Sequence, residues 1–235
     1  QWGIVESWSI CAEDEGWCRR SLADYVEYKR RYEALQTTFD PVGFDPARWA
    51  RAARDAGMKY VVFTTKHHDG FSMFDTQYSD YKITSARTPF HAHPRANVTK
   101  EIFEAFRAEG FMVGAYFSKP DWHSEDYWWP NFATPDRNVN YDPDRYPDRW
   151  NAFVGFLHNQ VMELMTGYGR LDILWLDGGW VKARSKAEID RMYRERLAES
   201  PPGFVKSRVV NHDPGKDEVV ARARAKQPGL SDPGK

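Results

Sequence analysis

Apolar residues in this chain gather in short runs, separated by longer stretches in which apolar and polar positions alternate with helical spacing. Runs that are rich in β-branched and aromatic residues favour β-strands. Four such runs are Trp2–Ser7, Tyr60–Thr65, Phe111–Phe117 and Leu171–Asp177, and residues 207–211 are a candidate for a fifth. The last of the four has the composition of a strand covered on both faces, as strands are in a parallel sheet.

Helices are predicted around these runs, over residues 21–36, 45–57, 97–110, 145–167 and 216–227. Asp45 followed by Pro46 is a typical helix start, and Asn97 marks another start in the same way. Gly57 and Gly110 follow the last helical turns, where glycine tolerates the left-handed backbone that ends a helix. Helix, glycine, strand and polar loop recur in this order, which indicates a parallel α/β sheet.

The predicted fold class is therefore α/β, and we expect a (β/α)8 TIM barrel in one domain over residues 1–235. Such barrels typically need about 250 residues, and the segment after Gln227 is too short for a further strand, so we expect the barrel to be incomplete at its C-terminal end. The chain also opens inside a predicted strand without a Met, so we expect a trimmed N-terminus, and the compartment stays unknown.

Composition narrows the classes of partner. The chain is 41% hydrophobic and 29% charged with a formal net charge of -1, so nothing favours nucleic acid or acidic membranes. No apolar run reaches the roughly 18 residues of a membrane span, so we expect no membrane insertion. Aromatic residues reach 15%, and their rings serve as stacking platforms in sugar sites as well as in large cores. Cys11 and Cys18 favour two free thiols, although a local bridge stays open.

The candidate chemistry lies where the predicted strands end, because active sites of parallel barrels lie at the C-terminal ends of strands. Asp177 ends the fourth strand, with Trp175 and Trp180 on either side and two glycines after it. A carboxylate framed by indoles is typical of a glycoside hydrolase nucleophile. The alternative is that Asp177 caps the following helix.

His67 and His68 follow the second strand. Adjacent side chains of an extended chain point to opposite sides, which disfavours chelation of one metal ion, so we expect no metal. As neutral imidazoles, both can exchange hydrogen bonds with sugar hydroxyls. The alternative is one structural and one merely exposed imidazole. Beside them, Asp69 is expected either to pair with Lys66 or to cap the next turn.

Three further aromatic side chains are candidates for the same mouth. Trp8 follows the first strand, Tyr116 lies near the end of the third, and His123 comes in the loop after it, beside Trp122. Together with the carboxylate and the imidazoles, these groups suit a small polar ligand that has an apolar face, such as a sugar.

Three motifs, in this order, resemble the α-L-fucosidases of glycoside hydrolase family 29: Lys66–Phe71 (KHHDGF), Gly114–Ser118 (GAYFS) and Trp175–Trp180 (WLDGGW). The helix 44–57 is also similar to that family, and the similarity covers about residues 1–180. The resemblance implies a retaining exo-hydrolase that releases terminal α-L-fucose from fucosylated glycans and needs no cofactor. It implies these roles: Asp177 as nucleophile, Trp175 as the ring beside it, His67 and His68 as contacts to fucose hydroxyls, and Tyr116 as a sugar-site tyrosine.

Two departures from the family pattern qualify this expectation. Members usually carry His-Trp-Gly after the first strand, whereas this chain has Glu6–Ser9 (ESWS), so Ser7 replaces a sugar-contacting His. The substrate could then be another deoxy sugar or an α-L-galactoside. The family's acid/base lies downstream, and Glu218 falls in a helical pattern, so we expect that group outside this chain. A sugar-binding protein, or an inactive fragment without the proton donor, is the alternative function.

Overall fold

A computed structural model describes residues 7–12 and 24–178 of the chain, all of them within one compact unit. The described helices are η1 (Ser7–Ile10), α1 (Tyr25–Ala34), η2 (Leu35–Thr38), α2 (Pro46–Asp55), η3 (Pro89–Ala92), α3 (Val98–Ala108) and α4 (Pro147–Gly167). The strands are β1 (Tyr60–Lys66), β2 (Met112–Ser118) and β3 (Ile173–Asp177). The predictions for residues 2–6, 207–211 and 216–227, together with Cys18, Trp180 and Glu218, fall outside the described residues.

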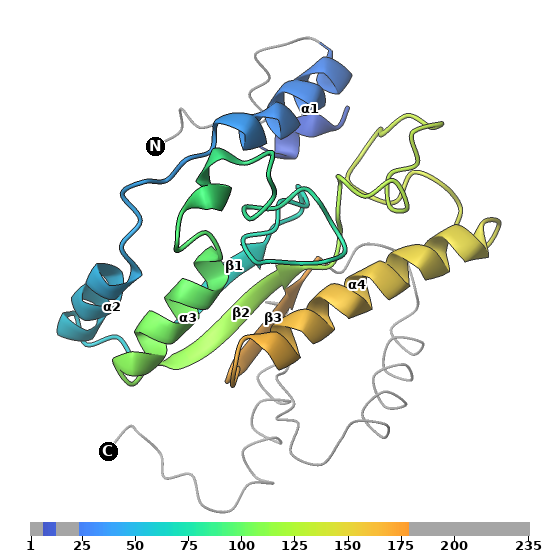
Figure 1. Ribbon diagram of the computed structural model, residues 1–235. Coiled ribbons are helices and arrows are strands. Elements are labelled where there is room, and N and C mark those ends of the chain that lie inside the picture. The colour runs from blue at the N-terminus through green and yellow to red at the C-terminus, as the bar shows by residue number, and fades with distance from the viewer. Residues whose placement is uncertain (1–6, 13–23, 179–235) are drawn as a thin grey trace, which may run out of the picture. The chain divides into compact units, whose positions relative to one another are not determined.

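The three described strands form one parallel sheet in the order β1-β2-β3 (Figure 1). β2 is central, so Tyr116 is paired with Thr64 on one side and with Trp175 on the other. At the C-terminal edge Ser118 is paired with Asp177. The predicted α/β alternation with a parallel sheet is confirmed for this part of the chain, and the closed eight-stranded barrel stays a prediction.

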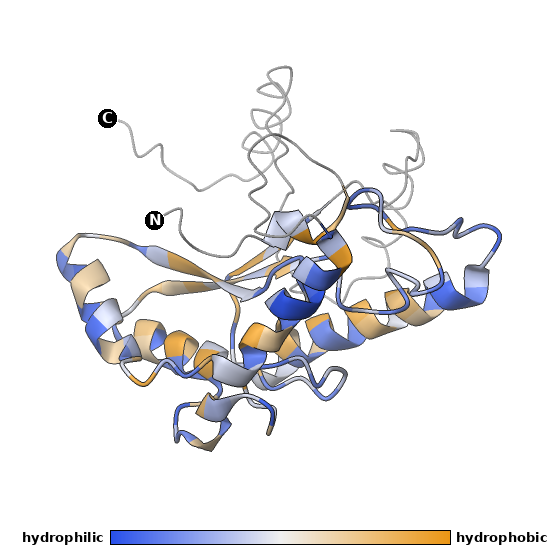
Figure 2. Cartoon of the chain, turned by 90° about the horizontal axis from the view of Figure 1, so that it is seen from above, coloured by the Kyte–Doolittle hydropathy of each residue, from blue (hydrophilic) through white to orange (hydrophobic). Residues whose placement is uncertain are grey.

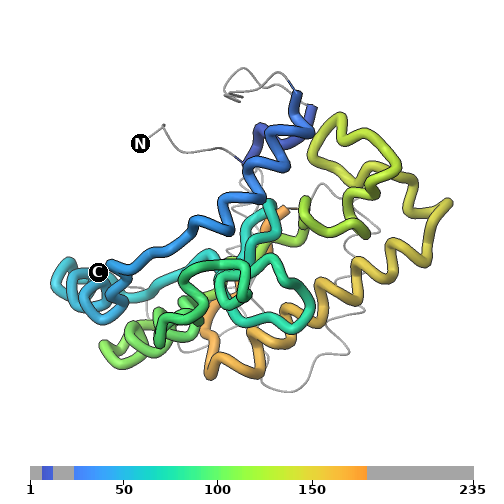
Figure 3. Tube along the Cα trace, turned by 45° about the horizontal axis from the view of Figure 1, so that its top comes forward, coloured from blue at the N-terminus to red at the C-terminus, as the bar shows by residue number. Residues whose placement is uncertain are grey.

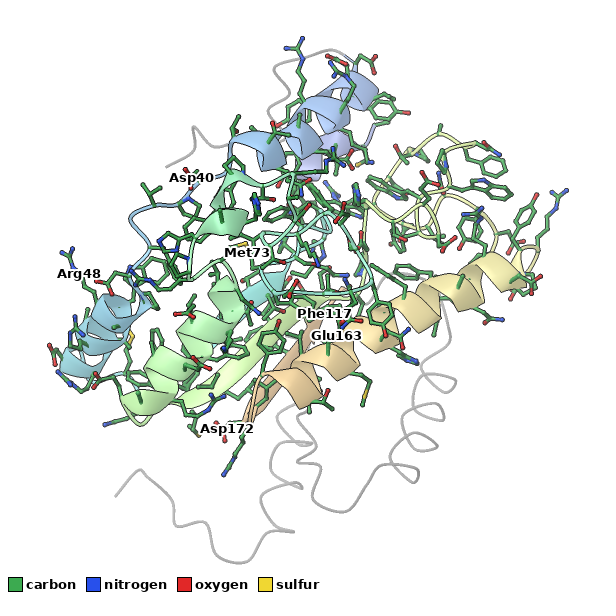
Figure 4. All side chains as sticks on the ribbon, viewed as in Figure 1. Asp40, Arg48, Met73, Phe117, Glu163 and Asp172 are labelled. Carbon is green, nitrogen blue, oxygen red and sulfur yellow. The ribbon has the colours of Figure 1, made fainter. Side chains whose placement is uncertain are left out.

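Helices cover one face of this sheet, as the view along its edge shows (Figure 2). Val113 and Ala115 of β2 pack into one apolar core with Phe103 of α3. Farther along β2, Phe117 packs against Leu164 of α4, which lies along this face (Figures 3 and 4). Because alternate residues of a strand point to opposite faces, the remaining side chains of β2 point away from the helices.

Helix ends follow the predicted capping residues. The Asp45 carboxylate accepts a hydrogen bond from the Arg48 N–H at 3.0 Å, and the Asn97 side chain accepts one from the Lys100 N–H at 3.3 Å. Each cap satisfies an N–H group that lacks a partner within the helix. Gly57 has a φ of 77°, a backbone conformation that costs little only for glycine. These predicted boundaries of α2 and α3 are confirmed.

Two details of the predicted elements differ within the described residues. Within the predicted first strand and its loop, Ser7–Ile10 forms a 3-10 helix, which buries Ile10 against Trp122. The described residues cover β3 on one face only, and Trp175 is 56% exposed on the face away from the helices. In the described sheet β3 is an edge strand with helices on one face only. Among the described residues, no helix is both long and apolar enough to cross a membrane.

The two ends of β3 are tied to β2 by polar contacts. At the N-terminal end the Asp172 carboxylate accepts a hydrogen bond from the Val113 N–H at 2.9 Å (Figure 4). At the other end the Lys119 N–H donates to the Asp177 carbonyl at 2.9 Å. These contacts fix the register of β3 and so hold Asp177 beside the last residue of β2.

Candidate active site

Asp177 is the last residue of β3, and its carboxylate reaches solvent with 41% of the side chain exposed. The Tyr116 hydroxyl donates to Asp177 Oδ2 at 2.5 Å. The two side chains lie on the same face of neighbouring strands, the face without helices. The arrangement holds one carboxylate oxygen in place and leaves the group accessible from the C-terminal edge of the sheet.

The surroundings of Asp177 favour its ionised form. Partial burial by itself raises the pKa, but hydrogen bonds from Tyr116 and from the Gly178 N–H hold the pKa below its usual value. Burial also raises the pKa of Tyr116, so the phenol keeps the proton that it donates. At neutral pH the site therefore presents an anionic oxygen that is able to act as a nucleophile.

The two imidazoles lie side by side, which corrects the prediction that they point to opposite sides. β1 ends at Lys66 after a shift of register, so His67 and His68 follow the strand in an irregular turn. Their ring centroids are 4.2 Å apart, and the His67 ring stacks on Tyr116 with an angle of 13° between the planes. His68 Nε2 lies 3.8 Å from Asp177 Oδ2.

No group of three or more His, Cys, Asp or Glu side chains that could hold a metal ion occurs within residues 7–12 and 24–178. The two neighbouring imidazoles and the Asp177 carboxylate form a polar cluster at the end of the sheet.

His68 is the more deeply buried of the pair, at 2% exposure. Its Nδ1 contacts the Ser118 hydroxyl, and its ring meets Trp122 at 5.2 Å and the edge of Trp8 at 5.9 Å. Burial, with a smaller contribution from the neighbouring His67, lowers the pKa of His68 to about 4. The ring is therefore neutral over most of the pH range in which proteins work.

This pKa predicts a pH dependence of stability. Between pH 6.5 and about 4 the unfolded state binds a proton at His68 that the folded state does not, so the free energy of unfolding falls as pH falls. The full difference is on the order of 3 kcal/mol. Urea unfolding at pH 7 and at pH 4.5 measures it. His68→Gln should reduce the difference, whereas His158→Gln on the exposed side of α4 should not. Equal pH dependence in both variants would exclude this role for His68.

Lys66 does not pair with Asp69, which was the first of the two predicted alternatives. Its fully buried Nζ lies 2.8 Å from Asp121 Oδ2 and 2.9 Å from Gln160 Oε1 of α4. The ammonium also lies 4.4 Å from the centre of the Phe117 ring. Burial lowers the pKa of Lys66, and Asp121 offsets this in part.

Asp69 joins a different cluster. Its carboxylate accepts a hydrogen bond from the Tyr32 hydroxyl at 2.7 Å and a longer one from the Phe71 N–H at 3.4 Å, so the turn-capping alternative is the one observed. Burial raises the pKa of Asp69. His123, a predicted rim residue, binds Glu33 at 2.8 Å and stacks on Tyr81 in this second cluster.

Trp8 lies close to the site, as predicted. Its ring packs edge-on against His68, and the Arg137 guanidinium lies 3.9 Å above it. The structure thus brings together Asp177, Tyr116, His67, His68, Trp8 and Trp175. Ser118 and Gly178 also contribute; the sequence places both at strand ends but predicts no contact of either within the site. Ser118 could have been recognised as a site residue, because it is paired with Asp177 and both residues end their strands.

The sequence of the chain matches the model of one known protein family. The model of the family described as alpha-L-fucosidase matches residues 2–230 of the 235-residue chain. The chain belongs to the α-L-fucosidase family. The α-L-fucosidase resemblance predicted from the three sequence motifs is therefore confirmed.

Several relatives carry the same family name. Alpha-L-fucosidase 1 of Arabidopsis thaliana is 29% identical over 161 residues, which are 68% of this chain and 26% of that protein. A putative alpha-L-fucosidase 1 of rice, Oryza sativa, is 34% identical over 155 residues, 66% of this chain and 25% of the relative. The chain thus spans about a quarter of the length of these two α-L-fucosidases.

Solved structures of α-L-fucosidases are also similar. A GH29 α-L-fucosidase of Bacteroides thetaiotaomicron, captured as a covalent intermediate with 2-fluoro-fucosyl fluoride, has 30% identity and a TM-score of 0.59, and the match covers 74% of this chain and 37% of that one. An isoenzyme of Paenibacillus thiaminolyticus has 40% identity and a TM-score of 0.52, over 74% of this chain and 39% of that one. The similarity thus extends to the arrangement of the elements in space.

Proposed function

We propose that the protein of which this chain is part is a retaining exo-glycosidase that hydrolyses terminal α-L-fucose through a covalent intermediate on Asp177. The observation that carries this proposal is the Asp177 carboxylate, which is ionised, accessible and held by Tyr116 at the end of a parallel strand. The covalent intermediate named for the Bacteroides relative supports the same chemistry in this family.

The reaction would proceed in two steps. Asp177 attacks the anomeric carbon while the bond to the leaving oxygen breaks, and positive charge that develops on the sugar ring is stabilised by the carboxylate. Tyr116 orients the attacking group through its hydrogen bond to Oδ2. Water then releases the sugar with help from a second carboxyl about 5–5.5 Å away. No described residue is assigned that role, and Glu218 lies outside them.

Substrate recognition would come from the groups around the nucleophile. His67 and His68 exchange hydrogen bonds with sugar hydroxyls, since both imidazoles face the Asp177 end of the sheet. Trp175, a residue that is 56% exposed on the strand that carries the nucleophile, offers a platform for the apolar side of a deoxy sugar. Trp8 would bound the opposite side beside His68.

For the architecture, we propose that the three strands are part of a (β/α)8 barrel in a single domain, and that residues 1–235 are a part of this domain. The parallel order of the strands, the helices on one face and the TM-score of 0.59 to an α-L-fucosidase support this proposal.

A trapping experiment tests the proposed function. The protein is incubated with 2-fluoro-fucosyl fluoride, digested and analysed by mass spectrometry. We expect one added 2-fluoro-fucosyl group, on the peptide that contains Asp177. A label on another residue would contradict the assigned nucleophile. Fucose binding with neither label nor hydrolysis of an aryl α-L-fucoside would instead favour the sugar-binding alternative.

A further inference from the structure

Ser118 is the last residue of the central strand, between the ends of the strands that lead to His68 and carry Asp177. Its side chain is fully buried. The hydroxyl makes two contacts, one with His68 Nδ1 and one with the Pro120 carbonyl oxygen at 2.8 Å. Neither contact is used in the mechanism described above.

The number of protons available determines which group donates in each of these two hydrogen bonds. A carbonyl oxygen carries no proton, so the contact between two oxygens at 2.8 Å requires the serine hydroxyl to donate to Pro120. The hydroxyl has only one proton, so its contact with His68 needs a proton from the ring. His68 Nδ1 therefore donates, and in a neutral ring Nε2 then carries a lone pair.

Packing holds the Pro120 carbonyl in place. Gly178 has a φ of 76°, and a Cβ at this position would lie only 2.3 Å from Pro120 Cδ. The residue after the nucleophile must therefore be glycine for Pro120 to pack as it does. The Trp122 N–H in turn donates to the His68 carbonyl at 2.8 Å, which fixes the backbone of the histidine. The orientation of the serine hydroxyl is thus built into the end of the sheet.

We propose that Ser118 is a positioning residue that sets the tautomer of His68, with the proton on Nδ1 and an acceptor at Nε2 beside Asp177. In this state His68 accepts a hydrogen bond from a ligand hydroxyl and does not donate one to Asp177. The tautomer itself rests only on the geometry around Ser118. Its consequence for sugar selection rests on the proposed function, since it requires a sugar hydroxyl that donates at this position.

Loss of the serine hydroxyl reverses the arrangement. In Ser118→Ala, Nδ1 loses its acceptor, and the Asp177 carboxylate 3.8 Å from Nε2 favours a proton on Nε2. His68 then donates to the nucleophile and no longer accepts from the ligand. We expect affinity for fucose to fall roughly 10- to 100-fold, because a ligand donor is left without its acceptor.

The first test reads the tautomer directly. Long-range ¹H–¹⁵N NMR of the imidazoles at pH 7 distinguishes protonated from unprotonated ring nitrogens, and His68→Gln identifies the signals of His68. We expect a protonated Nδ1 in the unmodified protein and a protonated Nε2 in Ser118→Ala. An unprotonated Nδ1 in the unmodified protein would overturn the proposal, and this measurement needs neither activity nor a variant that replaces the serine.

The second test reads the consequence for ligands. Binding of fucose is compared with binding of monofluoro analogues, in which fluorine accepts but cannot donate. We expect one analogue to bind roughly 10-fold or more weaker than fucose to the unmodified protein, and this difference to shrink in Ser118→Ala. Ser72→Ala is the matched control, since that buried hydroxyl has no hydrogen-bond partner among the described residues and its loss should leave the difference intact.

The outcomes separate the two proposals. The expected tautomer without fucoside hydrolysis would count against the proposed function and leave the role of Ser118 standing. Hydrolysis of the fucoside by a protein whose His68 Nδ1 is unprotonated would support the proposed function and overturn the role of Ser118. Equal discrimination among the analogues in Ser118→Ala and in the unmodified protein would show that the serine does not select the ligand.

Discussion

Replacing Asp177 with Ala is expected to reduce hydrolysis of an aryl α-L-fucoside roughly 10⁴-fold or more, as removal of a nucleophile does in other hydrolases. The variant keeps Tyr116 and both imidazoles but lacks the oxygen that bonds to the sugar. Azide should restore part of the activity, because a small anion fits the space of the missing carboxylate. Steady-state kinetics with and without azide, and the configuration of the fucosyl azide formed, measure this result.

Asp172→Asn is the matched control for this experiment. Asp172 lies beyond the opposite end of β3, where its carboxylate accepts the Val113 N–H, and the amide oxygen of Asn can accept in the same way. We expect this variant to keep nearly full activity. Activity in Asp177→Ala close to that of Asp172→Asn would remove Asp177 from the reaction and with it the proposed mechanism.

Replacing Asp121 with Ala is expected to lower the free energy of unfolding by about 3–5 kcal/mol, because the buried Lys66 ammonium loses its counter-charge. The side chains of this pair are 0% and 3% exposed, so water cannot compensate. Asp121 Oδ1 also accepts the N–H groups of His123 and Ser124, which adds unsatisfied donors to the cost. Urea unfolding followed by tryptophan fluorescence at pH 7 measures the change.

Two further variants test whether buried charge is the cause. Asp126→Ala removes an ion pair with Arg149 whose side chains are 40% and 27% exposed, and it should cost no more than about 1 kcal/mol. Adding Lys66→Met to Asp121→Ala should recover stability, since an uncharged chain then lies beside Phe117. If the double variant is less stable than Asp121→Ala, lost packing rather than an unpaired charge explains the effect.

Features with local causes could be predicted from the sequence. Asp45 and Asn97 cap their helices through backbone N–H groups three residues away, so the signal and its partner lie in one short segment. The strand that ends on Asp177 is equally visible, because apolar runs and glycine punctuation are local patterns. The same reasoning places the carboxylate at the end of a parallel sheet, where the structure has it.

Features that depend on distant partners could not be predicted. Lys66 has a local candidate in Asp69, but its partners Asp121 and Gln160 lie 55 and 94 residues along the chain. The relation of His67 to His68 follows from a shift of register with β2, which no pattern within β1 reveals. The exposed face of β3 likewise reflects which elements pack on it, and periodicity along one strand does not contain that information.

The shift of register between Thr64 and Lys66 has a consequence for the position of the Lys66 charge. In a regular strand Thr64 and Lys66 would share a face. The Lys66 ammonium would then project toward Tyr116 and toward the Asp177 carboxylate, to which Tyr116 donates a hydrogen bond. Lys66 is instead paired with Phe117 and contacts Gln160 in the helical layer. One irregular step of the main chain thus turns the Lys66 ammonium away from the proposed nucleophile and into the helical layer.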